Sequence, residues 1–273
     1  MARKKGKIIG VVSAGGGVGK TTTVANLGVT IAKEFNKDIL VLDGNISTAN
    51  LGLHLGLVYP PVTLHDVLKD KISIIQAIYV HESGLHVVPS SLGLDMDVNP
   101  VYLGRKIERL KDRYDLILID SAPGLSKEVL SVMKAVDGLL IMTTPDIASI
   151  VTSLKLIDLA RKMKVSIIGL VLNMIRKKSY EMREDDIVNS LEVPVIAKIP
   201  DDEKIPEAVA VKMPVVLYDP LSPASIAFKK LAAHLIEEKY EPPGIWYRIK
   251  SLFSRKQEGR FLKNKDERLL KPT

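Results

Sequence analysis

Ser13-Ala14-Gly15-Gly16-Gly17-Val18-Gly19-Lys20-Thr21-Thr22 is the stretch of sequence that decides the fold. The apolar run before it, at 7–12, predicts a strand, and the apolar spacing that begins at Val24 predicts a helix. Glycines let the backbone turn tightly and bring successive N–H groups close to phosphate oxygens, and the start of the helix adds its positive dipole end. The stretch therefore predicts a phosphate-binding loop between a strand and a helix.

Lys20 and Thr21 indicate which phosphate compound this loop takes. In the strict pattern G-x-x-x-x-G-K-[ST], the lysine reaches the terminal phosphates and the hydroxyl contacts magnesium. This chain has Ala14 where the strict pattern has Gly, so its loop is a variant. The dinucleotide fingerprint G-x-G-x-x-G fits in no register, and a glycine-rich turn that binds nothing would rarely carry Lys-Thr after its glycines. The pattern favours a nucleoside triphosphate site.

The variant loop resembles the deviant phosphate loop of the MinD/ParA ATPases, K-G-G-x-G-K-[ST], and is closest to that of the MinD regulators of cell-division sites. The family's signature lysine falls on Gly15, and the positions after it match up to Thr21. The resemblance extends from about residue 7 to about residue 238. It implies a P-loop ATPase with ATP and Mg²⁺ as cofactors. The loop residues implied to bind the nucleotide are Gly15, Gly16, Gly17, Val18, Gly19, Lys20, Thr21 and Thr22.

Short apolar runs alternate with helical patterns over about the first 235 residues. This alternation predicts an α/β fold with a doubly wound, mostly parallel sheet and helices on both faces. In such sheets, ligands bind at the carboxyl ends of the strands. The predicted strands are 7–12, 38–42, 85–88, 115–119, 138–143, 166–172 and 195–199.

Asp43 and Asn45 follow the second predicted strand. An acid at a strand end beside a phosphate loop commonly holds a magnesium-bound water, although an Asp there also serves to cap the next helix. MinD-like proteins carry D-x-D-x-x-x-x-N-L at this point, and Asn45 stands where they have the second Asp. An asparagine cannot accept a proton as a base, but it can orient a water. The resemblance thus implies catalytic roles for Lys20, Asp43 and Asn45.

Asp120 ends the fourth predicted strand, and a Pro-Gly turn follows at 123–124. This arrangement has the Walker B form, in which an apolar strand delivers an acid to the magnesium shell. A buried strand ending in a helix-capping Asp is the alternative. Beside a phosphate loop we expect the metal site, with Thr21, Asp43 and Asp120 around the ion.

Asn173 follows the sixth predicted strand and matches the asparagine that contacts adenine in the family. An amide can read a base edge with one donor and one acceptor, and a loop-capping Asn is the alternative. The segment after the seventh strand resembles the one that lines the other side of the base. Its residues implied in cofactor binding are Pro200, Asp201 and Asp202.

The composition excludes several classes of function. The chain of 273 residues has no cysteine, which excludes disulfides, thiolate catalysis and cysteine-ligated zinc or iron–sulfur clusters. The five histidines show no metal-ligand spacing and are interpreted as surface or ordinary interior residues. No run of 18 apolar residues and no signal peptide is recognised, so we expect a cytoplasmic protein.

The basic charge is concentrated at the end of the chain. Residues 244–273 carry a net charge of +6 and the rest of the chain carries +1. After the Pro-Pro-Gly linker at 241–244, residues 245–256 place apolar side chains within an arc of about 120° with basic residues beside it. This pattern predicts a membrane-targeting helix on an anionic surface. Its expected contact residues are Ile245, Trp246, Arg248, Ile249, Lys250, Leu252 and Phe253.

These observations predict an ATPase domain at 1–240, the linker, the amphipathic helix and a basic mobile tail at 257–273. A helix packed on the body or on a partner, or a tail that binds nucleic acid, are the alternatives for 245–273. The near-neutral body argues against nucleic acid.

MinD proteins also end in a short amphipathic helix. The resemblance therefore implies an ATP-dependent homodimer that associates reversibly with the inner face of the cell membrane. It also implies a regulatory protein partner and a role in positioning cell-division or surface machinery. Gly15 and Asn45 replace residues that serve ATP hydrolysis and dimerisation in the family, so we expect slow or absent ATP turnover. A non-hydrolysing membrane scaffold and, less favoured, a ParA-like DNA-segregation ATPase are the alternatives.

Overall fold

The computed structural model describes residues 5–93, 98–242 and 244. The predicted membrane helix at 245–256 and the tail at 257–273 lie outside these residues. The chain divides into two compact units, 1–238 and 239–273, and the sheet belongs to the first. No helix among the described residues is both long enough and apolar enough to cross a lipid bilayer.

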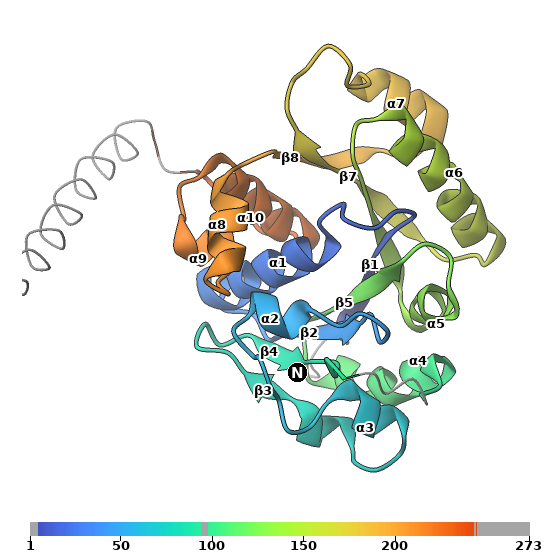
Figure 1. Ribbon diagram of the computed structural model, residues 1–273, viewed down its shortest axis with the longest axis vertical. Coiled ribbons are helices and arrows are strands. Elements are labelled where there is room, and N and C mark those ends of the chain that lie inside the picture. Colours follow the sequence, from blue (N-terminus) through green and yellow to red (C-terminus); the bar gives the residue numbers. More distant parts are fainter. Residues whose placement is uncertain (1–4, 94–97, 243, 245–273) are drawn as a thin grey trace, which may run out of the picture. The chain divides into compact units, whose positions relative to one another are not determined.

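Strands and helices alternate along most of this unit, as Figure 1 shows. The strands are β1 (Lys7–Ser13), β2 (Ile39–Gly44), β3 (Tyr79–Val80), β4 (His86–Val88), β5 (Leu116–Pro123), β6 (Gly138–Thr143), β7 (Ile167–Ile175) and β8 (Val195–Pro200). The α-helices are α1 (Lys20–Phe35), α2 (Leu51–His54), α3 (Leu64–Leu68), α4 (Leu103–Ile107), α5 (Lys127–Ala135), α6 (Ile147–Lys162), α7 (Glu184–Leu191), α8 (Lys204–Ala210), α9 (Val215–Tyr218) and α10 (Pro223–Leu235). Three 3₁₀ turns lie at Ile74–Ala77, Pro100–Tyr102 and Glu108–Asp112.

The strands form one sheet in the order β3-β4-β2-β5-β1-β6-β7-β8. All pairs are parallel except β3 with β4, which is antiparallel. The seven predicted strands are therefore confirmed, and the mostly parallel α/β fold with them. The sequence did not indicate β3, because two residues at a sheet edge are too short for a periodic signal.

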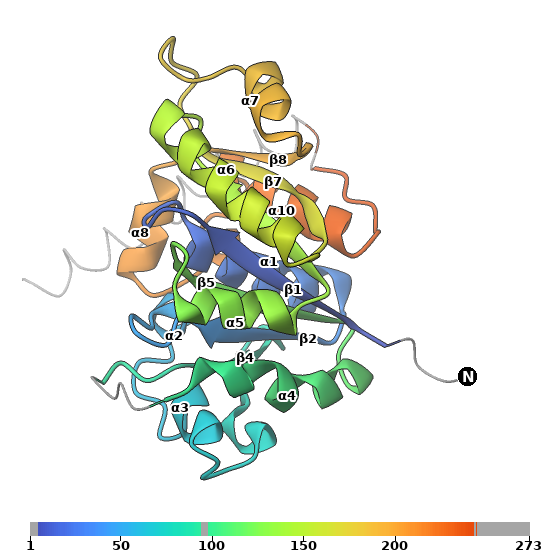
Figure 2. The same cartoon turned by 90° about the vertical axis from the view of Figure 1, so that its right-hand side faces the viewer.

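Helices cover both faces of this sheet (Figures 1 and 2). Successive side chains of a strand point to opposite faces, so Ile8 and Val12 of β1 join one core and Ile9 and Val11 join the other. Helices α3 to α7 contribute to the first core, and α1, α2 and α8 to α10 to the second. Burial on both faces explains why the strands read as continuous apolar runs rather than alternating patterns.

The order of the strands places the glycine-rich loop near the middle of the sheet, at the carboxyl ends of the strands. β1 lies between β5 and β6, and the chain leaves β1 through residues 14–19 directly into α1. The next strand along the chain, β2, lies on the β5 side, whereas β6 and β7 lie on the other side. Loops that leave in opposite directions open a crevice at the carboxyl ends of the strands, which is where open α/β sheets bind ligands.

Candidate functional site

The glycine-rich loop turns through backbone conformations that favour glycine. Gly17 has a φ of 73° and Gly19 a φ of 90°, and α1 begins at the next residue, Lys20. A Cβ on Gly19 would lie 2.2 Å from Nδ2 of Asn173 on β7. Glycine is thus required at position 19 by both conformation and space, whereas a Cβ on Gly15 would meet nothing within 4 Å.

A cavity of about 310 Å³ lies against this loop and the start of α1. Segments after β1 and β2 and the carboxyl ends of β5 and β7 all reach it, so the strand ends converge in one place. The lining residues are Gly16, Gly17, Gly19, Lys20, Thr21, Thr22, Asn45, Thr48, Asn50, His54, Ser121, Pro123 and Met174.

Lys20 lines the cavity and is almost completely buried, with 7% of the residue exposed. Its Nζ donates a hydrogen bond of 2.8 Å to Oγ of Ser13, which in turn donates one of 2.6 Å to the Gly15 carbonyl. Burial lowers the pKa of Lys20, and the nearby Asp120 carboxylate opposes that shift. A desolvated ammonium group in a glycine loop interacts strongly with an anion, because little water competes for it.

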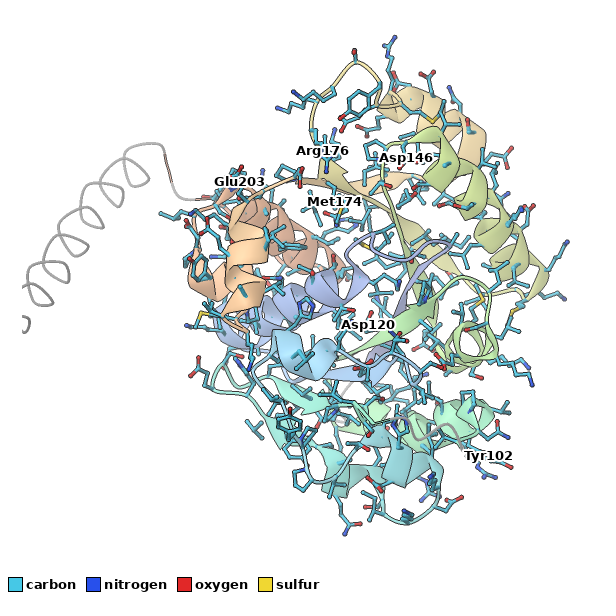
Figure 3. The ribbon with its side chains drawn as sticks, in the orientation of Figure 1. Tyr102, Asp120, Asp146, Met174, Arg176 and Glu203 are labelled. Atoms are coloured by element: carbon cyan, nitrogen blue, oxygen red, sulfur yellow. The ribbon has the colours of Figure 1, made fainter. Side chains whose placement is uncertain are left out.

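Asp120 lies at the carboxyl side of β5, near the centre of the domain in Figure 3, and is fully buried. Its Oδ2 accepts a 2.5 Å hydrogen bond from Oγ1 of Thr21, while its Oδ1 has no hydrogen-bond partner in the described part of the chain. Desolvation raises the pKa of Asp120 to about 6, and Thr21 and Lys20 oppose the shift. A buried carboxylate oxygen without a partner beside a hydroxyl is a donor set that fits Mg²⁺.

Asp43 stands beside Asp120 on the neighbouring strand, in register with it, and is equally buried. Its carboxylate accepts hydrogen bonds from the backbone N–H groups of Asn45, Asn50 and Leu51, at 3.1–3.2 Å. Desolvation and the Asp120 carboxylate raise the pKa of Asp43 well above its ordinary value, against those backbone hydrogen bonds. The structure thus shows a capping contact of Asp43 to α2; its roles toward magnesium and in catalysis stay predictions.

Asn45 lines the cavity, but both ends of its amide contact Thr48. Its Nδ2 donates to the Thr48 carbonyl at 2.8 Å, and its Oδ1 accepts from the Thr48 hydroxyl at 2.9 Å. This local ring orients the side chain. The Oδ1 keeps one lone pair for a further donor, so the predicted role of Asn45 in orienting a water is compatible with the geometry.

Asn173 lies beneath the loop rather than in the cavity lining. Its Nδ2 donates to the Val18 carbonyl at 2.8 Å, and its buried Oδ1 has no hydrogen-bond partner among the residues described. In this arrangement the asparagine supports the phosphate loop. The predicted contact of Asn173 with a base stays a prediction.

The predicted base-binding segment after β8 also lies apart from the loop cavity. Pro200 pairs with Ile175 at the end of β7, and Asp201 accepts a 2.7 Å hydrogen bond from Arg176 Nε. Asp202 accepts from the backbone N–H groups of Lys204 and Ala224, so it anchors two helix starts. Arg176, the partner of Asp201, lies close to Met174 in Figure 3, and Met174 lines the cavity. The segment therefore lies at the same end of the strands as the cavity.

Sequence reasoning missed several residues that the structure brings to the site. Ser13 and Thr48 hold Lys20 and Asn45, and Met174 borders the cavity. His54 was interpreted as a surface or ordinary interior residue, but it lines the cavity. The signal that could have found it is its spacing: it lies four residues, about one helical turn, after Asn50.

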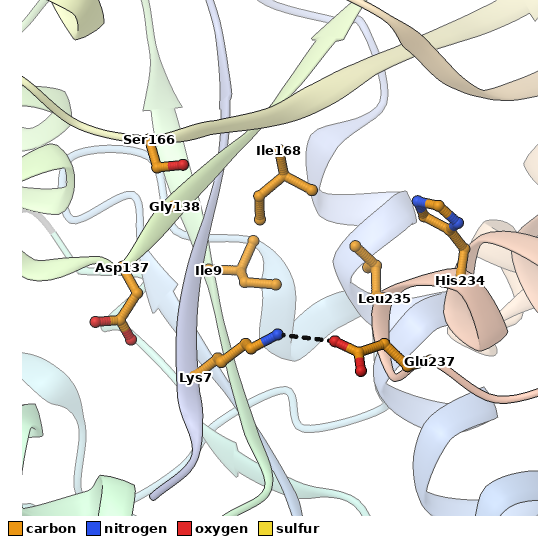
Figure 4. Close-up of a pocket in the computed structure, with 9 residues that line it drawn as sticks. All are labelled: Lys7, Ile9, Asp137, Gly138, Ser166, Ile168, His234, Leu235 and Glu237. Carbon is orange, nitrogen blue, oxygen red and sulfur yellow. Dashed lines mark hydrogen bonds and ion pairs between the residues drawn. The ribbon is translucent and has the colours of Figure 1, made fainter.

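A larger cavity, of about 480 Å³, lies at the opposite end of the strands (Figure 4). It borders the amino ends of β1 and β6 and includes the ion pair of Lys7 with Glu237, at 3.1 Å. Both partners of this pair are largely exposed. None of the strand-end motifs reaches this cavity, so volume does not decide where the functional site lies.

The chemistry of the loop agrees with the comparison of the whole chain with protein families. A family model described as the CobQ/CobB/MinD/ParA nucleotide binding domain matches residues 9–215. The chain belongs to this family. The phosphate loop, Asp43, Asp120 and Asn173 all lie within the matched range.

Relatives within the family include proteins of known structure. An uncharacterized ATP-binding protein of Methanocaldococcus jannaschii is 39% identical over 235 residues, which are 85% of this chain and 89% of that protein. The cell division ATPase MinD of Pyrococcus furiosus has a TM-score of 0.81 at 35% identity, over 85% of this chain and 99% of the other. The septum site-determining protein MinD of Pyrococcus horikoshii, in complex with Mg-ADP, has a TM-score of 0.80 at 33% identity, over 84% and 95%.

Proposed function

We propose that this protein is a MinD-like ATP-binding protein that hydrolyses ATP slowly or not at all. It binds ATP with Mg²⁺ in the cavity at the phosphate loop and dimerises in the ATP-bound state. The dimer associates reversibly with the inner face of the cell membrane through residues 245–253. There it positions cell-division or surface machinery together with a regulatory protein partner.

One observation carries the nucleotide part of the proposal. A buried ammonium group, Lys20, and a buried carboxylate with an unpartnered oxygen, Asp120, border one glycine-lined turn at a helix start. The ammonium and the backbone N–H groups suit phosphate, and the carboxylate with Thr21 suits a divalent cation. Mg²⁺ would supply positive charge to the phosphate oxygens. The Mg-ADP complex of the Pyrococcus horikoshii relative supports the same assignment.

Two replacements support slow turnover. Gly15 removes the positive charge that the family's signature lysine brings, and the space around its Cα is open. Asn45 replaces an acid, and its amide is held by Thr48. A neutral amide cannot take a proton from water, whereas the residues proposed to bind the nucleotide are retained.

The membrane part of the proposal rests on sequence alone, since residues 245–273 lie outside the described structure. The chain's single Trp lies in the proposed helix at 245–256, next to the basic residues that give 244–273 a net charge of +6. One helix of this length binds lipid weakly. Two helices of an ATP-bound dimer would bind the surface together, and their joint affinity would exceed that of either helix alone.

The binding of Mg-ADP, measured by titration calorimetry, tests the nucleotide site. We expect Lys20→Ala to lose about 10- to 100-fold in affinity, because it removes a charged hydrogen-bond donor to phosphate. Lys198→Ala is the matched control, since Lys198 is exposed, pairs with Glu184 and lies outside the cavity. Equal affinities for the wild type and Lys20→Ala would overturn this site.

Co-sedimentation with anionic liposomes tests the membrane switch. We expect the full-length protein to bind with ATP and to dissociate with ADP, and the variant Trp246→Glu with Phe253→Glu to stay in solution in both states. Binding that ignores the nucleotide would support the static scaffold instead. Failure of the full-length protein to bind any liposome would remove the membrane role.

The scaffold that binds ATP without hydrolysing it remains the second candidate, and Gly15 and Asn45 are the residues that favour it. The double variant Gly15→Lys with Asn45→Asp separates the two functions. A lysine fits at position 15, where a Cβ meets nothing within 4 Å. A large gain in ATP turnover would show that only these two groups limited hydrolysis, and unchanged turnover would favour the scaffold.

A further inference from the structure

His54 lies where the phosphate-loop cavity meets α2. The backbone connects it to the site, since the N–H of His54 donates to the Asn50 carbonyl at 3.3 Å and the N–H of Asn50 donates to Asp43 at 3.2 Å. Asp43 therefore holds the first turn of α2, and α2 places the imidazole at the cavity. The position of His54 follows from contacts already present in the site.

The charge of the cavity lining makes His54 notable. Among the described residues that line the cavity, only Lys20 and His54 can carry a positive charge. The others are glycines, hydroxyl and amide side chains, a proline and a methionine. The phosphates of a nucleotide bring several negative charges beside the buried Lys20, where a further cationic group has a large effect.

We propose that His54 binds the phosphates of the nucleotide as an imidazolium group, a second cation beside Lys20. This inference rests on the proposed nucleotide site and adds a residue to it. His54, on α2, gives the cavity a positive charge. The loop itself lacks this charge, because Gly15 stands in place of the family's signature lysine. Binding of the nucleotide then takes up a proton on His54.

The proton balance follows from the burial of the side chain. Burial lowers the pKa of His54, and no charged or hydrogen-bonded neighbour contributes to that shift. Of the elements packed on α2, α1 carries Lys20 at its start and Lys33 and Glu34 at its end, and β2 carries Asp43. Burial thus favours the neutral imidazole when no nucleotide is bound. A phosphate anion raises its pKa, so affinity rises as the pH falls.

Calorimetric titration with ADP in the absence of Mg²⁺ tests this inference. The pKa of Asp120 is also about 6, and its carboxylate repels the same phosphates, so the difference between wild type and His54→Gln at each pH, rather than the wild-type profile alone, isolates the contribution of His54. A His54 pKa raised by about one unit in the complex, from a value below the ordinary 6.5, makes the contribution of His54 to wild-type affinity up to about sixfold larger at pH 6 than at pH 8. His54→Gln loses this contribution and binds up to about eightfold more weakly than the wild type at pH 6, with a smaller difference at pH 8. His234→Leu, an exposed position on α10 that lines the other cavity, is the matched control.

Imidazole NMR signals of the wild-type protein give a second readout that needs no variant. ADP raises the pKa of the His54 signal, and the His234 signal reports on effects outside the cavity. A His54 pKa unaffected by bound ADP, or equal affinities of wild type and His54→Gln at every pH, overturns the inference and leaves the nucleotide site intact. Absence of ADP binding by the wild type, with and without Mg²⁺, overturns the nucleotide site itself.

Discussion

At the scale of single residues, Gly19 and Asn173 show how little room the phosphate loop has. The φ of Gly19 is 90°, and a Cβ there would overlap the Asn173 amide at 2.2 Å. We expect Gly19→Ala to destabilise the fold by about 1–3 kcal/mol and to abolish nucleotide binding, because the loop must move or Asn173 must release Val18. Urea unfolding followed by circular dichroism measures the first effect.

Gly15→Ala is the control for that variant, four residues earlier in the same loop. A Cβ at position 15 meets nothing within 4 Å, and its φ does not lie in the left-handed region. We expect its free energy of unfolding to stay within about 0.5 kcal/mol of the wild type. Equal losses of stability in the two variants would contradict the role assigned to Gly19.

The carboxyl group of Asp120 makes stability depend on pH. Its pKa is about 6 in the folded protein, against 3.8 as the ordinary value. Between these values the folded state holds a proton that the unfolded state has released. The free energy of unfolding therefore falls as the pH rises from about 4 to about 6, by at most about 1.4 kcal/mol per pH unit.

We expect magnesium to reverse this trend above pH 6, because only the ionised carboxylate would bind the proposed ion. We expect Mg²⁺ with ADP to raise the melting temperature more at pH 7.5 than at pH 5. Asp120→Asn is expected to lose the metal-dependent part of that increase and to show a flatter stability profile between pH 4 and 6. A pH profile of Asp120→Asn that matches the wild type would refute the assignment.

At the scale of elements, the attachment of α10 to α1 stabilises the side of the domain that carries the loop. Phe228 of α10 is completely buried in the same core as Leu27 and Ile31 of α1. Beside it, Lys229 forms a 2.5 Å ion pair with Glu34 on α1. Since α1 begins at the phosphate loop, this packing helps to hold the loop in place.

Truncation of Phe228 measures that packing. We expect Phe228→Ala to lower the free energy of unfolding by about 3–5 kcal/mol, through lost burial and the cavity left behind. Phe228→Leu keeps much of the volume, and its expected cost is less than about 1.5 kcal/mol. Urea denaturation of the two variants provides the measurement, and similar losses in both would argue against tight packing at this position.

At the scale of the whole molecule, the cavity joins segments from both sides of the central strand. Asn45 and Ser121 reach it from the β2 and β5 side, and Met174 reaches it from the β7 side. A ligand bound there stabilises both halves of the sheet together. At 100 times the dissociation constant, one bound ligand adds about 2.7 kcal/mol to stability.

Hydrogen exchange detects this coupling directly. We expect Mg-ADP to slow amide exchange in residues 14–22, in 45–54 and at the carboxyl end of β5, because these segments surround the cavity. Residues at the amino ends of β1 and β6, beside the cavity of Figure 4, serve as the internal control. Protection confined to 14–22 would mean that the other segments do not respond to the nucleotide.

The sequence by itself determined the main elements and the chemical class of the site. Strands buried on both faces appear in the sequence as continuous apolar runs. Glycines followed by Lys-Thr are rare outside phosphate-binding loops. Seven strands, the loop and the acids at the strand ends were therefore predictable. β3 was not, because its two residues at the edge carry no pattern, and it depends on pairing with β4.

Only the tertiary structure decided which polar atoms meet. Asp43 bonds to backbone N–H groups as far as Leu51, Asn173 supports Val18 from a strand 155 residues away, and His54 lines the cavity. Such contacts depend on the order of the strands in the sheet and on the orientation of α2. Neither produces a periodic pattern in the sequence. Local physics thus determined the elements and the loop, whereas long-range packing decided the partners of each buried charge and amide.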